Sequence, residues 1–144
     1  HIMKKGLIYT LLICSVLPCS AFADSRIKTI NNKVAAIEKR IKQDNIPKIV
    51  LKYDLGENEG SPPEAAYYYD WKTKKLIAVK IHVGHEVFGI DHSYYFENDR
   101  ILKYLKTYSN HPQNPPRSAI IYADDGTVFW KNMDAPATSA GAIL

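Results

Sequence analysis

The sequence predicts an α+β domain in which one N-terminal amphipathic helix packs on an antiparallel β-meander of about six strands. Two observations predict this fold. Isoleucine and valine recur at helical spacing before Pro47. After Pro47, three similar units follow, and each joins an aromatic or β-branched strand to a second apolar strand through a polar turn. One helix followed by a run of strands is typical of an α+β domain.

Residues 1–23 have the features of a short cloning remnant followed by a bacterial secretory signal. Lys4 and Lys5 precede an apolar run over residues 6–17, and Ala21-Phe22-Ala23 resembles a signal-peptidase site. The run is shorter than the roughly 20 residues that span a bilayer, so we expect no stable membrane anchor. We expect cleavage near Ala23 to release a periplasmic or secreted protein.

The composition of the chain after the predicted signal limits the kinds of site and partner that the protein can have. We expect one domain over residues 24–132 and a flexible tail over residues 133–144. Both cysteines, Cys14 and Cys19, fall in the signal, which leaves no thiol for a disulfide, a metal site or a nucleophile. The signal also carries two basic residues and no acid, so the net charge of +4 falls to +2. A charge this small does not favour a nucleic-acid partner.

The predicted helix covers residues 24–45. Its apolar residues are spaced by three or four positions and form one stripe: Ile27, Ile30, Val34, Ile37 and Ile41. Asp24 or Ser25 is the expected N-cap, and Asn45 with Pro47 is the expected end of the helix. A single narrow stripe suits packing on one face of a sheet.

The predicted sheet begins with a strand over residues 48–55. Three repeated units follow at nearly equal intervals along the chain, and they begin at Tyr67, Tyr94 and Ile120. Asn98-Asp99 and Asp125-Gly126 are typical residues for hairpin turns that need positive φ angles. Each unit therefore predicts one β-hairpin of the meander, whether the repeat is inherited or an echo of common turn chemistry.

The segment VGHEVFGIDH, residues 83–92, is rich in metal-ligating side chains. It resembles half of the zinc-protease motif, but Gly89 stands where the second histidine belongs. A looser metal site would use His82, His85 and His92, with His82 and His92 paired across the sheet and Glu86 or Asp91 as an oxygen ligand. The alternative is a solvated polar loop, and we expect neither a metal nor a cofactor.

Catalytic patterns are missing from the sequence. No glycine-rich phosphate loop and no nucleophile elbow occurs, and the paired acids sit in turns, where acids serve as turn formers. We therefore expect a protein that is not an enzyme, with a hydrolase as the less favoured alternative.

Tyrosine is abundant, and neighbouring strand residues point to opposite faces, so the tyrosines cannot all face the core. High β-propensity explains most of them. We also expect some of them to line a binding face opposite the helix, flanked by polar and acidic loops, because tyrosine is common in protein-binding surfaces. The residues predicted to bind a partner are Tyr68, Trp71, Tyr95, Asp54, Glu57, Glu59, Asp124, Asp125, His85 and Asp91.

These features favour a non-catalytic periplasmic domain that binds a protein. The expected role is an inhibitor or immunity protein against an envelope-acting toxin or a cell-wall hydrolase. The alternatives are a metal or small-ligand binder that uses the His82–His92 loop, and an envelope assembly factor. Edge strands of a meander can also pair between copies, so a homodimer is compatible with the sequence.

Overall fold

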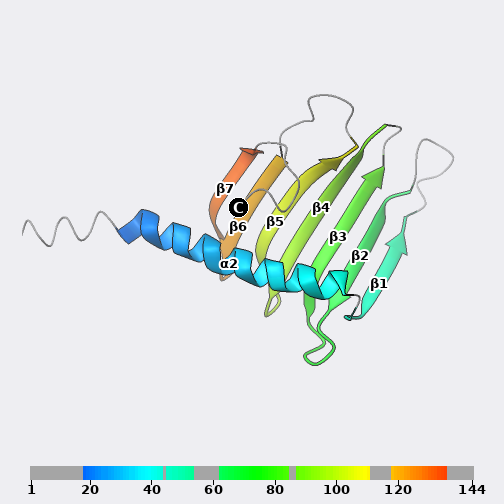
Figure 1. Ribbon diagram of the computed structural model, residues 1–144, viewed down its shortest axis with the longest axis horizontal. Coiled ribbons are helices and arrows are strands. Elements are labelled where there is room, and N and C mark those ends of the chain that lie inside the picture. Colours follow the sequence, from blue (N-terminus) through cyan, green and yellow to red (C-terminus); the bar gives the residue numbers. More distant parts are fainter. Residues whose placement is uncertain (1–17, 44, 54–61, 85–86, 111–117, 136–144) are drawn as a thin grey trace, which may run out of the picture.

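The computed structural model describes residues 18–43, 45–53, 62–84, 87–110 and 118–135. One helix, α2 (Pro18–Lys42), lies across a seven-stranded antiparallel sheet whose strands follow one another in chain order (Figure 1). The predicted α+β meander is confirmed. Its strands are β1 (Lys48–Lys52), β2 (Glu64–Tyr69), β3 (Leu76–Gly84), β4 (Gly89–Glu97), β5 (Arg100–Ser109), β6 (Ser118–Asp124) and β7 (Thr127–Ala135).

Helix α2 packs through the predicted stripe. Ile30 and Val34 are buried in the core, and the other members of the stripe, Ile27, Ile37 and Ile41, pack against it half-buried. The helix begins at Pro18, so the predicted cap at Asp24 or Ser25 is wrong; the Ser25 carbonyl accepts a hydrogen bond from the Thr29 hydroxyl inside the helix. Described helical residues thus lie on both sides of the predicted cleavage site near Ala23.

The three predicted hairpins are β2–β3, β4–β5 and β6–β7. Two of their turns have paired positive φ angles, at Asn98 and Asp99 (51° and 63°) and at Asp125 and Gly126 (52° and 79°). Two consecutive left-handed residues match the right-handed twist of the flanking strands, and asparagine, aspartate and glycine tolerate that conformation best. Strand β7 reaches Ala135, beyond the domain boundary at residue 132 that composition suggests.

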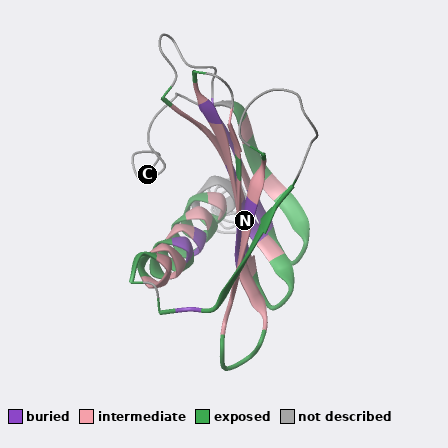
Figure 2. Cartoon of the chain, turned by 90° about the vertical axis from the view of Figure 1, so that its right-hand side faces the viewer, coloured by how far each residue is buried: buried purple, intermediate pink, exposed green. Residues whose placement is uncertain are grey.

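The core lies between α2 and one face of the sheet, and Figure 2 shows the helix on that side alone. Register partners form a continuous row across the strands beneath the helix. This helix-face row consists of Tyr68, Ala78, Tyr95, Lys103, Tyr122 and Trp130. The buried cluster also contains Leu102, and Leu105 and Ile120 from an adjacent row.

The heptad spacing along the helix matches the spacing of the hairpins across the sheet. Arg26, Lys33 and Arg40 are spaced one heptad apart and form ion pairs with Asp124, Glu97 and Asp70. Glu97 and Asp124 end the first strand of their hairpins, and Asp70 directly follows β2. Seven helical residues rise about 10.5 Å, and two strand spacings measure about 9.6 Å. Each two-strand unit therefore meets two turns of α2, which explains why the repeat of the sheet and the heptad of the helix coexist.

The first edge of the sheet, β1, is short, and its central residues Ile49, Val50 and Leu51 are 53%, 41% and 45% exposed. Lysines at both ends of this strand discourage edge-to-edge pairing between copies. Within the described residues, no helix combines the length and the hydrophobicity needed to cross a bilayer.

Candidate functional site

The sheet face opposite α2 carries a second row of register partners that crosses all seven strands. This open-face row consists of Ile49, Tyr67, Val79, Tyr94, Tyr104, Ile121 and Lys131. Strand pleating forces these side chains to the side away from the helix, because their neighbours in the chain, such as Tyr68 and Tyr95, point to the core. No described element covers this row (Figure 2).

The open-face row is apolar and ordered by contacts between its own members. The rings of Tyr94 and Tyr104 are 4.9 Å apart between centroids, in a tilted arrangement. Val79 is only 7% exposed beneath its neighbours, whereas Ile49 is 53% exposed. Aromatic pairs at this separation hold each other in place, so the face presents fixed rings rather than freely moving ones.

His92 lies on the same face, in the adjacent row between Ile81 and Lys106. Its Nδ1 is 2.7 Å from the Tyr104 hydroxyl, and the two rings stack with centroids 6.0 Å apart. Burial lowers the pKa of His92 below its usual 6.5, and the positive charge of Lys106 lowers it further. Burial raises the pKa of Tyr104. Both rings are therefore uncharged near neutral pH, which lowers the cost of covering them.

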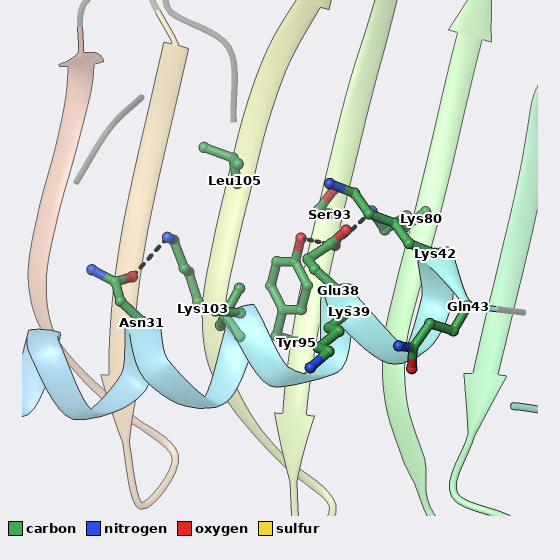
Figure 3. Close-up of a pocket in the computed structure, with 12 residues that line it drawn as sticks. Asn31, Glu38, Lys39, Lys42, Gln43, Lys80, Ser93, Tyr95, Lys103 and Leu105 are labelled. Atoms are coloured by element: carbon green, nitrogen blue, oxygen red, sulfur yellow. Dashed lines mark hydrogen bonds and ion pairs between the residues drawn. The ribbon is translucent and has the colours of Figure 1, made fainter. Parts of the chain in front are cut away.

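Tyr68 and Tyr95 do not lie on the open face, so the prediction that they line a binding face opposite the helix is wrong. Tyr95 is 2% exposed under α2, and its hydroxyl donates a 2.6 Å hydrogen bond to Glu38 (Figure 3). Burial raises the pKa of Tyr95, and the bond to Glu38 raises it further. Tyr68 packs half-buried against the same core.

The remaining described residues of the predicted binding set are scattered. Trp71 is 54% exposed in the β2–β3 loop, where Lys72 lies 5.5 Å from its ring centroid. Asp124 pairs with Arg26 on the helix, and Asp125 pairs with Arg100. These two acids are thus neutralised within the protein and do not form an unpaired acidic patch. Asp54, Glu57, Glu59 and His85 lie outside the described residues.

The pairing of His82 with His92 that the alternative metal site requires does not occur. His82 pairs with Asp91, and His92 pairs with Ile81, so the two imidazoles point to opposite faces. His82 Nδ1 lies 2.7 Å from Asp91 Oδ1 on the helix side. Among the described residues, no three histidine, cysteine, aspartate or glutamate side chains converge closely enough to hold a metal ion.

Gly89 has a structural reason to be glycine. A Cβ at this position would lie 2.4 Å from Cε1 of His82 and 2.6 Å from Oγ of Ser109. The glycine therefore leaves room for the His82 ring beside Asp91. Gly89, which replaces the second histidine of the zinc-protease motif, is thus the residue against which the His82 ring packs.

The members of the open-face row, Tyr67, Tyr94 and Tyr104 above all, were not among the predicted binding residues. In YYY (67–69) and YY (94–95), tyrosine occupies both faces of the strand. The sequence therefore does not reveal which of the alternating residues face the helix. The usable signal was the repeat itself. Tyr68, Tyr95 and Tyr122 are evenly spaced along the chain, and residues at equivalent positions of a repeat share one face.

The arrangement as a whole offers a broad, rigid, aromatic surface without a described cluster of catalytic groups on it. Such a surface is suited to contact with another macromolecule. Comparison of the chain with protein-family models, with curated protein sequences and with solved structures finds no match.

Proposed function

We propose that this protein is a non-catalytic, exported binding domain that docks a protein partner through the open face of its sheet. The observation that carries the proposal is the open-face row, an unbroken line of mostly apolar and aromatic side chains across all seven strands with no described element over it. Extended apolar surface of this kind is uncommon on monomeric proteins and usually marks a site of association.

The chemistry of the face favours a protein over a charged polymer. Tyr94 and Tyr104 combine a large apolar ring with a polar hydroxyl, and neither side chain loses much conformational freedom on binding because they already pack together. The lysines Lys106 and Lys131 of this face lie in different rows and on strands that are not neighbours, β5 and β7, so these two do not form a continuous basic stripe.

The biological role that we propose is inhibition of, or immunity to, an envelope-acting toxin or a cell-wall hydrolase. It is supported by the secretory signal predicted from residues 1–23 and by the small size of the domain. Electrostatic attraction between acidic loops and a basic partner gives this role less support than we expected from the sequence, because Asp124 and Asp125 already pair with arginines. Complementarity of apolar surface is therefore the proposed source of affinity.

The test begins with the purified protein and envelope extract of the producing cells. A partner captured by crosslinking is purified, and the binary complex is measured by calorimetry and by the partner's hydrolytic or toxic activity. We expect one-to-one binding and loss of activity at stoichiometric amounts. Binding to outer-membrane assembly components without loss of any activity would support the assembly-factor alternative instead.

A matched pair of variants locates the interface. Tyr94→Lys places a charge in the centre of the open-face row, and Asn32→Lys adds the same charge on the exposed side of α2. We expect Tyr94→Lys to weaken binding by at least about tenfold, the effect of losing one buried aromatic contact, and Asn32→Lys to leave it unchanged. Equal affinities for the two variants would refute docking through this face.

A further inference from the structure

A cavity of about 590 Å³ lies between the C-terminal half of α2 and strands β3–β5, on the face opposite the proposed docking surface. Val34, Ala35 and Leu105 contribute its apolar wall, and Ser93, Tyr95 and Lys103 line it from the sheet (Figure 3). Its volume is in the range of small-molecule sites, roughly 300–1,000 Å³. Nothing in the proposed protein-binding function uses this space.

Lys103 is the unusual group in the cavity. It stands in the helix-face row between Tyr95 and Tyr122, and it is 4% exposed. Its Nζ donates one hydrogen bond of 2.9 Å, to the Asn31 side-chain oxygen, and lies 5.1 Å from the Tyr122 ring centroid. No carboxylate among the described residues comes within ion-pair distance of it. An ammonium group has three donors, so the described residues supply this buried cation with only part of its set of hydrogen bonds and with no counter-ion.

The acid in the cavity is already engaged. Glu38 accepts 2.6 Å contacts from both the Tyr95 hydroxyl and the Lys80 ammonium group. Lys39 and Lys42 line the cavity as well, so four lysines share it with one carboxylate. The lining is therefore positively charged overall. Of these four lysines, only Lys80 has an acidic partner among the described residues, and Lys103 differs from the exposed Lys39 and Lys42 because its unpaired charge is buried.

We propose that this cavity binds an anionic amphiphile, a molecule whose single carboxylate or phosphate head pairs with Lys103 and whose apolar chain lies against Val34, Ala35 and Leu105. The head group supplies the counter-charge and the acceptors that Lys103 lacks, and the chain covers the apolar wall. The shared chemistry of a fatty-acid carboxylate and a lipid phosphate is an anion at the end of an alkyl chain.

The charge state of Lys103 agrees with this assignment. Burial lowers its pKa to about 8, partly offset by Glu38. The titratable groups that line the cavity with it are Glu38, Lys39, Lys42 and Lys80. Tyr95 and Tyr122 lie beside it in the helix-face row. A bound anion favours the charged form of the lysine, so binding and protonation of Lys103 must be linked.

The experiment is calorimetric titration of the purified protein at pH 7 with decanoate, decyl phosphate and uncharged decanol, each below its aggregation concentration. We expect the two anions to bind one-to-one, and decanol to bind at least about tenfold more weakly. The ratio between decanoate and decyl phosphate distinguishes a carboxylate from a phosphate source. Equal binding of decanol would overturn the proposal.

Two variants distinguish binding in the cavity from nonspecific binding elsewhere on the protein. Lys103→Met keeps most of the length of the side chain and removes the buried charge, so we expect the variant to fold and to bind decanoate at least about tenfold more weakly. Lys75→Met, at an exposed position outside the cavity, should bind as the wild type does. Unchanged affinity in Lys103→Met would show that Lys103 does not hold the head group.

An NMR measurement covers the case in which the variant folds poorly. In the wild-type protein labelled at lysine Cε, the pKa of Lys103 should rise on addition of decanoate, and the amide signals of Ser93, Tyr95 and Leu105 should shift. If the signals that shift belong to Tyr94, Tyr104 and Ile121 instead, the amphiphile binds the open face and the assignment to the cavity is wrong. This outcome leaves the proposed docking function unaffected.

Discussion

The hydroxyl of Tyr95 donates a 2.6 Å hydrogen bond to the carboxylate of Glu38, and this bond joins the central strand of the sheet to the C-terminal part of the helix. The same relationship recurs one unit along the chain. Tyr122, the equivalent residue of the next hairpin, donates a 2.9 Å bond to Asn31, which lies one heptad before Glu38 on the helix. Because both tyrosines are committed to the helix, the tyrosines of opposite parity are left on the open face.

Removal of the Tyr95 hydroxyl tests this link between helix and sheet. Tyr95→Phe keeps the ring but leaves Glu38 with Lys80 as its remaining partner. We expect the free energy of unfolding to fall by about 2 kcal/mol, the usual value for a hydrogen bond to a charged group. Urea unfolding measures it. Tyr94→Phe, on the open face, is the control and should change stability by less than about 0.5 kcal/mol.

Lys103 predicts a distinctive alkaline pH dependence. Its pKa is about 8 in the folded protein and 10.5 when exposed, so between these values the unfolded chain binds more protons than the folded one. Stability due to Lys103 therefore rises as pH increases from about 8 toward 10. Above pH 10 the buried tyrosines Tyr95 and Tyr122, whose pKa values are raised, oppose this gain, because their unfolded forms ionise first.

A comparison with Lys103→Met isolates that contribution, since the tyrosines are present in both proteins. We expect the variant to be more stable than the wild type at pH 7, and the difference to shrink by a few kcal/mol, roughly, by pH 10. Urea unfolding at pH 7, 8, 9 and 10 gives the curve. A difference that stays constant over this range would mean that Lys103 titrates normally in the folded protein.

His92 predicts a loss of stability in mild acid. Burial and Lys106 lower its pKa in the folded protein, so the unfolded chain takes up a proton first as pH falls below 6.5. Protonation then favours unfolding, and the penalty is complete below the folded-state pKa. His92→Gln should flatten the decrease in thermal stability between pH 7 and pH 5. NMR titration of the His92 ring in the wild type should give a midpoint below 6.5.

The β4–β5 turn offers a stabilising substitution. Asp99 has a φ of 63°, where glycine is favoured over any side chain. We expect Asp99→Gly to raise the free energy of unfolding by about 0.5 kcal/mol; the contact it removes, 3.9 Å to Lys75, is exposed and contributes little. Gly126→Ala, at a φ of 79°, should have the opposite sign and cost about 1 kcal/mol. Thermal unfolding compares both with the wild type.

The elements of the fold were predictable from local patterns. The stripe from Ile27 to Ile41 predicted the helix, and the residues of the Asn98-Asp99 and Asp125-Gly126 turns predicted two hairpins, because each signal lies within a few neighbouring residues. Which face each tyrosine occupies was not predictable in the same way. It depends on which alternate residues of a strand face the helix, and the helix is far away in the chain. Where two neighbouring residues are both tyrosine, the hydrophobic pattern is the same whichever of them faces the helix.

A tyrosine-bearing sheet face opposite the helix was predicted from the sequence, but the residues that form it were not. The alternative in which His82 faces His92 is excluded by one residue of register, since Asp91 is the partner of His82. Lys103 was not singled out at all, because a lysine in a strand ordinarily lies on the solvent side. Its burial follows from the position of Asn31 on the helix above it, which only the packed structure reveals.

The most direct test of the proposed docking is hydroxyl-radical footprinting of the protein alone and in complex with its captured partner. Docking through the open face predicts that oxidation of Tyr67, Tyr94 and Tyr104 falls several-fold in the complex, while that of the exposed Trp71 is unchanged. Protection of Trp71 with unchanged oxidation of these tyrosines would contradict the account and move the interface to the hairpin loops.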